Sequence, residues 1–501
     1  MNLSLASLER VPLSLRPVLD PNALSIGIVH LGLGAFHRAH QVAYTEAACQ
    51  KTGETRWGIC AASERSPVAA EMLASQDGLY SLLVANDEDH ELRVMASLRG
   101  ALFARRDADA LVAQIADSAV EVVTLTVTEK GYRHDQGTRK LRRDDPELDA
   151  DASGRKAVSV VGQLCRALEE RRRKDAGPLT IMSCDNLSSN GGLLHGLVDE
   201  LFSWPSARFD EGLAQWVAEN VTFPCSMVDR IVPATTDAFR TEAERQLGVT
   251  DRAVVVTEPF MQWVIEDRFA QGRPAWDRAG AELVEDVGPY ETLKLRVLNG
   301  SHSALAYLGL LAGIETIDEV SKLPTFEAFV HKLVDEEVRP TLTLPEAVDL
   351  DIYHEQVLKR FANTALPYRC TQVAADGSQK LPERLFGVIR ECLIVGAAPY
   401  CATLVVAAWL RALLVGVDDL GRRFELSDPM STQIKEAIGD TEDEARVVDR
   451  ALQISEVFGP DLCASERFKA MLTDALFQLS KGRITDVLAA VTQQSARRSP
   501  R

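Results

Sequence analysis

The sequence lacks several features that would assign it to a particular class of protein. It contains no run of eighteen or more apolar residues, so we expect no transmembrane helix. Its first residues, MNLSLASLERVPLSLRP, contain no basic segment followed by an apolar block, so we expect no signal peptide. Basic residues are outnumbered, with 55 Lys and Arg against 73 Asp and Glu and a formal net charge of −18. This balance argues against a nucleic acid or a membrane surface as partner, because both require a basic footprint.

Regularly spaced metal ligands and cysteine pairs are also missing. Nine cysteines are scattered along the chain without a CxxC pair, which predicts free thiols in a reducing compartment and therefore a cytoplasmic protein. His37 and His40 have HxxH spacing, but no matched cysteine or carboxylate cluster accompanies them. We therefore expect solvated or capping histidines at these two positions and no metal site.

The first 288 residues alternate between strand-like and helix-like segments. Helical patterns such as 157–174 and 193–204 lie between apolar runs that are rich in β-branched residues, and this alternation predicts a mostly parallel sheet with helices on both faces. The apolar runs are at 24–31, 57–63, 120–132, 179–186 and 253–260. Residues 1–288 are therefore predicted to form a Rossmann-type, doubly wound α/β domain. The charged stretch 133–156 is expected to be a solvated loop, with a lid as the alternative.

The remaining 213 residues, 289–501, have a different character. Their periodic segments have helical length and few strand candidates lie among them: 326–342, 352–363, 381–396, 400–417 and 474–492. Because 501 residues are too many for one compact core, we expect a second, mainly α-helical domain over 289–501 that carries substrate and catalytic residues.

A glycine-containing turn follows the first predicted strand, in the segment IVHLGLGAFHRAH. The first glycine, Gly32, would permit a tight turn, and the second, Gly34, would let backbone amides approach a pyrophosphate at the start of a helix. The third glycine position of the usual GxGxxG pattern is occupied by His37, so an ordinary strand–helix turn is the alternative reading. The residues expected to contact a dinucleotide are Gly32, Gly34, Ala35, Phe36 and His37.

The second predicted strand ends at Ser63, followed by Glu64 and Arg65. An acidic residue at this place can bind the adenosine ribose hydroxyls, which favours Glu64 as a further cofactor-binding residue. Arg65 would instead suit a 2′-phosphate. We expect NAD, with NADP as the alternative.

Three polar residues interrupt the start of an apolar helical pattern in KLRVLNGSHSALAYLGLL: Lys294, Asn299 and His302. On an α-helix they fall within an arc of roughly 140°, so all three can face one cleft. The structural alternative is that Lys294 reaches solvent and the other two are satisfied polar groups.

The functional interpretation of these residues is the oxidation of a secondary alcohol with a nicotinamide. A lysine desolvated by apolar neighbours can act as a base near neutral pH. Amide donors such as Asn299, and Asn186 from SCDNLSSNG, would stabilise the alkoxide, and His302 would hold a second hydroxyl. No metal is needed for this chemistry, so a zinc-dependent alcohol dehydrogenase is disfavoured. A catalytically inactive dinucleotide sensor is disfavoured too, because it would have little need of a base.

Several segments closely resemble the polyol-specific long-chain dehydrogenases, a family that includes mannitol dehydrogenases and fructuronate reductases. These segments are GLGAFHRAHQ, TLTVTEKGY, MSCDNLSSNG, FPCSMVDRIVP, TEPFMQWVIEDRFAQGRPAW and KLRVLNGSHSALAYLG, in the same order between about residues 26 and 382. The resemblance implies that Lys294 is the general base, that Asn186 and Asn299 bind the alkoxide and that His302 positions the substrate. It also implies a substrate-site role for Asp229 and a role for Glu129 in proton movement. Many relatives are monomers, which favours a monomer over a homodimer.

The segment YRCTQVAADGSQKLPERL, residues 368–385, distinguishes the branches of this family best. Mannitol dehydrogenases carry an arginine eight residues before the lysine, where this chain has Gln372 before Lys380. Gln372, the upstream Arg369 and DGSQKLP resemble the fructuronate reductase branch, so Arg369 and Lys380 are expected to clamp a carboxylate, with a surface position for Arg369 as the alternative. The resemblance implies NADH-dependent, reversible reduction of D-fructuronate to D-mannonate. The alternatives are a mannitol, arabinitol or sorbitol dehydrogenase and a tagaturonate reductase.

Overall fold

The computed structural model describes residues 1–87, 90–135, 138–154, 157–346 and 348–496. The chain forms two compact units, Met1–Gly288 and Pro289–Arg501. None of the helices in these described ranges is long and apolar enough to cross a membrane.

The first unit is built on a six-stranded parallel sheet. In spatial order its strands are β10 (Val221–Thr222), β9 (Leu179–Ser183), β6 (Val122–Leu125), β1 (Ile26–Leu31), β2 (Gly58–Ser63) and β5 (Leu98–Phe103). Along the chain, β1 is followed by β2 and β5 on one side of it, and then by β6, β9 and β10 on its other side. This is the doubly wound order. The predicted Rossmann-type fold is confirmed. The order reverses between β1 and β6, the place at which such sheets bind ligands.

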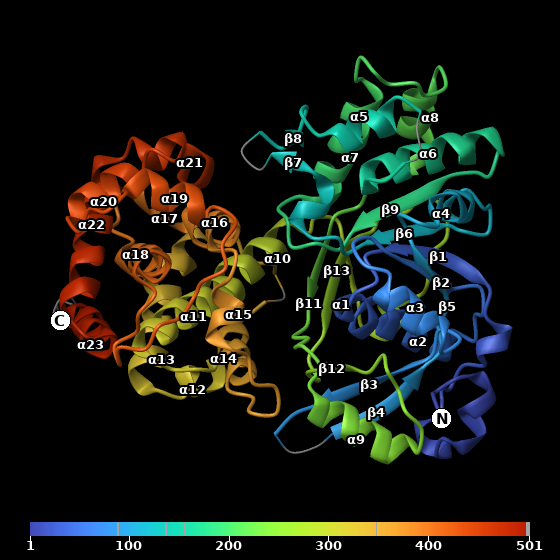
Figure 1. The fold of residues 1–501 in the computed structure, drawn as a ribbon, viewed down its shortest axis with the longest axis horizontal. Helices are drawn as coiled ribbons and strands as arrows, with labels where there is room; N and C mark the ends of the chain where they lie inside the picture. The colour runs from blue at the N-terminus through green and yellow to red at the C-terminus, as the bar shows by residue number, and fades with distance from the viewer. Residues whose placement is uncertain (88–89, 136–137, 155–156, 347, 497–501) are drawn as a thin grey trace. The chain divides into compact units, whose positions relative to one another are not determined.

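Helices cover both faces of this sheet because its strands are apolar on both faces. Val29 and Leu31 of β1 belong to one core, whereas Ile28 belongs to another on the opposite face. Figure 1 shows helices on each side of the sheet. The helices packed on the first core are α4 (Ala108–Ile115), α6 (Val160–Arg173) and α7 (Asn190–Phe202), and those on the second are α1 (Ala35–Ala39), α2 (Gln41–Thr52) and α3 (Val68–Ala74).

Two three-stranded sheets accompany the main sheet in the first unit. The predicted strand at 253–260 forms β12 (Val255–Thr257), which pairs with β3 (Tyr80–Ala85) and not with the main sheet. The other strands of these sheets are β4 (His90–Met95), β11 (Ser226–Asp229), β13 (Gln262–Glu266) and β14 (Glu282–Val284), and the further helices of the unit are α8 (Leu213–Asn220) and α9 (Asp237–Leu247).

The charged stretch 133–156 is folded where it is described, so the expectation of a solvated loop is wrong. It contains β7 (His134–Asp135), β8 (Lys140–Leu141) and α5 (Pro146–Ala152), and residues 136–137 and 155–156 lie outside the described residues. Its charges pair locally, since Arg133 bonds to Asp145 at 2.7 Å and Asp145 accepts the Glu147 amide at the start of α5. Leu148 is buried in the core, which ties the stretch to the domain.

The second unit is mainly helical, as predicted, and every strand named above lies in the first unit. Its α-helices are α10 (Gly288–Leu293), α11 (Gly300–Ala312), α12 (Ile317–Ser321), α13 (Pro324–Lys332), α14 (Leu350–Phe361), α15 (Cys370–Ala374), α16 (Gly377–Leu381), α17 (Gly387–Ile394), α18 (Tyr400–Val415), α19 (Ser431–Ile438), α20 (Glu444–Ala451), α21 (Ser455–Cys463), α22 (Glu466–Lys481) and α23 (Ile484–Ala496). Three π-helical turns join some of them: η6 (Lys294–Asn299), η7 (Leu333–Val338) and η9 (Pro382–Phe386).

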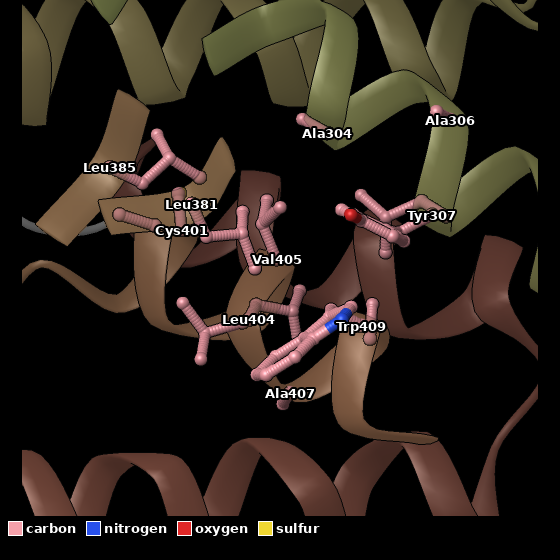
Figure 2. Packing of buried hydrophobic residues seen from close by; sticks show 14 of the residues in the cluster. Ala304, Ala306, Tyr307, Leu381, Leu385, Cys401, Leu404, Val405, Ala407 and Trp409 are labelled. Carbon is pink, nitrogen blue, oxygen red and sulfur yellow. The ribbon is translucent and has the colours of Figure 1, made fainter. Parts of the chain in front are cut away.

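The core of this unit packs α11 against α18 (Figure 2). Tyr307 and Trp409 are fully buried there, and Tyr307 donates its hydroxyl hydrogen to the Ala374 carbonyl at 2.9 Å. Gly377 must lack a side chain, because a Cβ at this position would lie 2.4 Å from both aromatic residues. These contacts hold α11 firmly, so the polar residues at its start are carried by a rigid element.

Candidate active site

The glycine turn lies at the carboxyl end of β1, beside the carboxyl ends of β2 and β6. Gly32 has a φ of +107°, and a Cβ there would lie 2.1 Å from the Thr126 carbonyl oxygen. Only glycine fits this position. Gly34 is exposed and precedes α1, whose residues Ala35 and Phe36 are half-buried. The five residues expected to contact a dinucleotide therefore all lie within residues 32–37, at the switch point of the sheet.

The side chain of His37 packs beneath this turn. Its ring stacks on His30 at 3.4 Å between centroids, and its ring nitrogens have no hydrogen-bond partner among the described residues. His30 bonds to Thr124 at 2.7 Å and to Thr126 at 2.8 Å, and burial lowers the pKa of His30 to about 3. His37 would therefore reach a dinucleotide through its backbone.

The expectation that His37 and His40 are solvated or capping residues is wrong, because both are fully buried and neither helix start has a side-chain cap. His40 Nε2 lies 2.8 Å from the Gln262 carbonyl oxygen. Within the part of the chain that the structure describes, no group of three or more His, Cys, Asp or Glu could hold a metal ion.

Glu64 lies just beyond the carboxyl end of β2. Its Oε1 is buried and has no hydrogen-bond partner in the described part of the chain. Burial raises the pKa of Glu64 to about 7, against a smaller lowering by a hydrogen bond from the Gln163 side chain to the carboxyl group. A buried acceptor without a donor fits a ribose hydroxyl, so the residues present fit a dinucleotide. Arg65 is exposed and donates to Thr128 Oγ1 at 3.1 Å.

Three more candidate residues follow strand ends of the first unit. Glu129 is half-buried and opens the turn after β6, and Asn186 is exposed on the loop after β9. Asp229 is 4% exposed, ends β11 and pairs with Gln262 across the strand ladder. Strand ends of this kind are where α/β domains carry functional side chains.

The start of α11 contains a π-helical turn, where we had expected regular α-helix spacing. The Gly300 amide bonds to the Leu295 carbonyl, five residues earlier. Residues five apart in a π-helix lie about one turn apart on the same side, so Lys294 and Asn299 align more closely than an α-helix would allow. Both are buried, at 4% and 8% exposure.

His302 lies three residues beyond Asn299, and its ring stacks on that of Phe361 at 4.8 Å between centroids. Its Nε2 and the Oδ1 of Asn299 are buried atoms that have no hydrogen-bond partner among the residues the structure describes. Burial, together with the nearby cations Arg384 and Lys380, lowers the pKa of His302 to about 3, so the imidazole is neutral at physiological pH. Buried polar atoms without a hydrogen-bond partner, next to a buried lysine, are typical of a ligand site.

The two residues of the expected carboxylate clamp have different surroundings. Lys380 is half-buried and donates to the Val373 carbonyl at 3.3 Å. The side chain of Arg369 is 66% exposed and pairs with Glu315 at 3.3 Å, so a clamp would require this ion pair to open. Gln372 is exposed.

Arg384 was missed by the sequence analysis. It donates to Ser303 Oγ at 2.9 Å and to the Asn299 carbonyl at 3.4 Å, and among the nearby cations it lowers the pKa of His302 most. Its spacing of four residues from Lys380 is the signal that would have indicated it, because residues four apart share one helix face.

A doubly wound sheet with a glycine turn, together with a buried lysine, a buried asparagine and a half-buried histidine, is typical of a dinucleotide-dependent oxidoreductase. Comparison with known proteins gives the family. Residues 26–278 match the profile of the mannitol dehydrogenase Rossmann domain, and residues 286–480 match that of the mannitol dehydrogenase C-terminal domain. The chain belongs to the mannitol dehydrogenase family.

Individual relatives agree with this assignment. The chain is 40% identical to the D-mannonate oxidoreductase of Escherichia coli (strain K12) over 481 residues, which cover 95% of this chain and 98% of the relative. It is 38% identical to the mannitol 2-dehydrogenase of Pyrenophora tritici-repentis (strain Pt-1C-BFP) over 487 residues, covering 95% and 83%. The Pseudomonas fluorescens mannitol 2-dehydrogenase, in a ternary complex with NAD and D-mannitol, superposes with a TM-score of 0.91 at 34% identity, covering 98% of this chain and 100% of that chain.

This family consists of NAD-dependent oxidoreductases that act on the CH–OH group of secondary alcohols. The resemblance and the enzyme class predicted from the sequence are therefore confirmed.

Proposed function

We propose that this enzyme reduces the keto group of D-fructuronate to the secondary alcohol of D-mannonate with NADH, and catalyses the reverse oxidation with NAD⁺. The observation that carries the proposal is a polar set made of the buried residues Lys294 and Asn299 and the half-buried His302, in which Asn299 Oδ1 and His302 Nε2 are buried atoms without a hydrogen-bond partner among the described residues. The similarity to a D-mannonate oxidoreductase over nearly the whole chain supports this substrate.

The first unit would hold the cofactor, which supplies or accepts the hydride when bound. Gly32 would let the backbone approach the pyrophosphate, and Glu64 would accept a hydrogen bond from a ribose hydroxyl. A carboxylate at this place disfavours a 2′-phosphate, so we propose NAD(H) rather than NADP(H). All nine cysteines lie within the described residues and are free thiols, in keeping with a cytoplasmic location.

Lys294 would move the proton in this reaction. In reduction its ammonium group donates a proton to the substrate oxygen as the carbonyl carbon gains a hydride, and in oxidation its amine accepts the hydroxyl proton. Asn186 and Asn299 would donate hydrogen bonds to the negatively charged oxygen without titrating. His302, neutral because it is buried, would bind a second hydroxyl through Nε2. By resemblance, Asp229 would bind substrate and Glu129 would take part in proton movement.

Cations around His302 favour a substrate that carries a carboxylate. Arg384, Lys380 and Arg360 all lower the pKa of this imidazole, which shows that they lie within electrostatic reach of it. An anionic group bound here would offset their mutual repulsion. Lys380 would pair with the carboxylate, and Arg369 would join it only if it left Glu315. A mannitol, arabinitol or sorbitol dehydrogenase and a tagaturonate reductase are the alternatives, supported by the similarity to mannitol 2-dehydrogenases.

The test is a comparison of kcat/KM for fructuronate, tagaturonate, fructose and xylulose, each with NADH and with NADPH. We expect fructuronate with NADH to be preferred by tenfold or more. The variant Gln372→Arg introduces the arginine that mannitol dehydrogenases carry, so it should shift the substrate preference toward fructose. A wild-type enzyme that prefers fructose tenfold would reject the uronate.

A further inference from the structure

A buried carboxylate joins two of the loops that carry candidate residues of the first unit. Asp185 is 8% exposed and lies two residues beyond the end of β9. Its Oδ1 accepts the Thr128 amide at 2.8 Å, and its Oδ2 accepts the Val127 amide at 3.1 Å. Both amides belong to the loop after β6, immediately before Glu129. Asp185 itself immediately precedes Asn186.

The loop after β6 has a conformation that needs such support. Thr128 has a φ of +64°, which is rarely adopted by a residue with a branched side chain. Tyr132, which ends the same turn and is fully buried, donates its hydroxyl hydrogen to Asp185 Oδ2 at 2.7 Å. The Ser183 hydroxyl is also 2.7 Å from the Tyr132 hydroxyl. The carboxylate therefore holds the loop at two places, on either side of Glu129.

The same network extends to the strand that ends at Asp229. Asn190, which is 2% exposed, donates to the Asp185 carbonyl at 2.9 Å and to the Ser226 carbonyl at 2.7 Å. Its Oδ1 accepts the Ser226 amide at 3.1 Å. Ser226 is the first residue of β11, and Asp229 is the last.

We propose that Asp185 is a positioning residue that sets the relative placement of Glu129 and Asn186, and through Asn190 that of Asp229. The inference rests on the function proposed above, because those three residues matter only if they handle substrate. Asp185 acts through its neighbours and does not itself contact the reacting atoms.

The charge of Asp185 makes this arrangement sensitive to pH. Burial raises the pKa of Asp185 to about 6, its hydrogen-bond donors lower it in part, and the negative charge of Glu129 raises it. The titratable groups that face it are Tyr132, Glu129 and the neighbouring Cys184. Protonation would remove an acceptor from one of the three donors, so the placement of the loops should change as the pH falls below about 6.

The test compares Asp185→Asn with Asp151→Asn. Asp151 is also a buried carboxylate of the first unit, and it accepts the Val158 and Ser159 amides at 2.8 Å together with the Ser159 hydroxyl at 2.5 Å. It therefore matches Asp185 in the number and kind of its hydrogen-bond donors, and these donors, Val158 and Ser159, lie outside the loops that carry Glu129 and Asn186. We expect Asp185→Asn to lower kcat/KM at least tenfold and Asp151→Asn to change it less than threefold, at matched losses of thermal stability.

Two further readouts separate positioning from stability. The wild-type pH profile of kcat/KM should fall below about pH 6, and this limb should be absent from the low, flat profile of Asp185→Asn. Tyr132→Phe removes one of the three hydrogen-bond donors to Asp185, so it should lower kcat/KM by less than Asp185→Asn does. It replaces Asp185→Asn in the test if that variant does not fold. Hydrogen exchange of residues 126–133 and 184–190 should accelerate in the Asp185 and Tyr132 variants and remain unchanged in Asp151→Asn.

Unchanged kcat/KM and exchange in Asp185→Asn would overturn the proposal, and so would equal losses in both asparagine variants. If the wild-type enzyme turns over none of the four sugars, the proposed function fails. The hydrogen-exchange comparison then still decides whether Asp185 holds the loops, because it needs no substrate.

Discussion

At the scale of single residues, the proposed proton transfer depends on the placement of Lys294. Its side chain is buried on a helix whose remaining face packs in the core, so it is placed with little freedom. Beside it, Asn299 and His302 present polar atoms that need a ligand. A substrate oxygen and a substrate hydroxyl would meet these needs.

Replacing Lys294 by alanine should lower kcat by about two to four orders of magnitude, because the proton would then have no positioned donor or acceptor. The matched control is Lys322→Ala, which removes an exposed lysine of the same unit that pairs with Asp318 at 3.8 Å. Stopped-flow or steady-state absorbance of NADH would measure both variants. A Lys294→Ala enzyme with near-normal turnover would show that another group moves the proton.

At the scale of elements, a buried carboxylate caps the start of a long helix in the second unit. Glu337 in η7 accepts the amides of Cys401 and Ala402 at the start of α18, the central helix of the second unit. The Cys401 contact is 2.6 Å and the Ala402 contact is 2.8 Å. A carboxylate suits this place, because the first amides of a helix have no partner within the helix.

Glu337→Ala should destabilise the second unit by about 2 kcal/mol or more, since two buried amides would lose their acceptor. Glu337→Gln keeps one acceptor and should lose less. Urea unfolding monitored by circular dichroism would measure both. Equal stability of the alanine variant and the wild type would mean that water or another group satisfies the amides.

The same residue makes a prediction about pH. Burial raises the pKa of Glu337 from 4.5 to about 7. Between these values the folded state holds a proton that the unfolded state has released, so this contribution to stability decreases as the pH rises. From pH 5 to pH 7.5 the wild type should therefore lose more stability than Glu337→Gln.

At the scale of the molecule, each unit has hydrophobic cores of its own. The first unit has one core on each face of its main sheet, and the second has a single large helical core. Since the glycine turn and Glu64 belong to the first unit, the stabilisation by a dinucleotide should appear first in the unfolding of that unit.

Calorimetry should show that NADH raises the unfolding temperature of the first unit more than NADPH does. At a ligand concentration one hundred times Kd, the expected stabilisation is about 2.7 kcal/mol. Glu64→Ala should reduce the NADH shift, whereas Glu71→Ala, which removes an exposed carboxylate of α3, should not. A larger shift with NADPH would reverse the proposed cofactor preference.

The sequence by itself determined the features that depend on local chemistry. The alternation of apolar runs and helical patterns predicted the doubly wound sheet, because strand and helix periodicity are properties of neighbouring residues. Gly32 was recognisable because a positive φ has few alternatives to glycine. Lys294, Asn299 and His302 were recognisable as polar residues in an apolar helix.

Only the tertiary structure decided how these groups are held. The Asp185–Thr128 hydrogen bond joins residues 57 positions apart, and Arg384 meets Ser303 across 81 positions, distances over which no local pattern operates. The π-helical turn before α11 and the pairing of Arg369 with Glu315 also depend on packing by distant segments. Local periodicity specifies which face of an element is buried, whereas the partner that a buried polar atom finds is set by the folded chain as a whole.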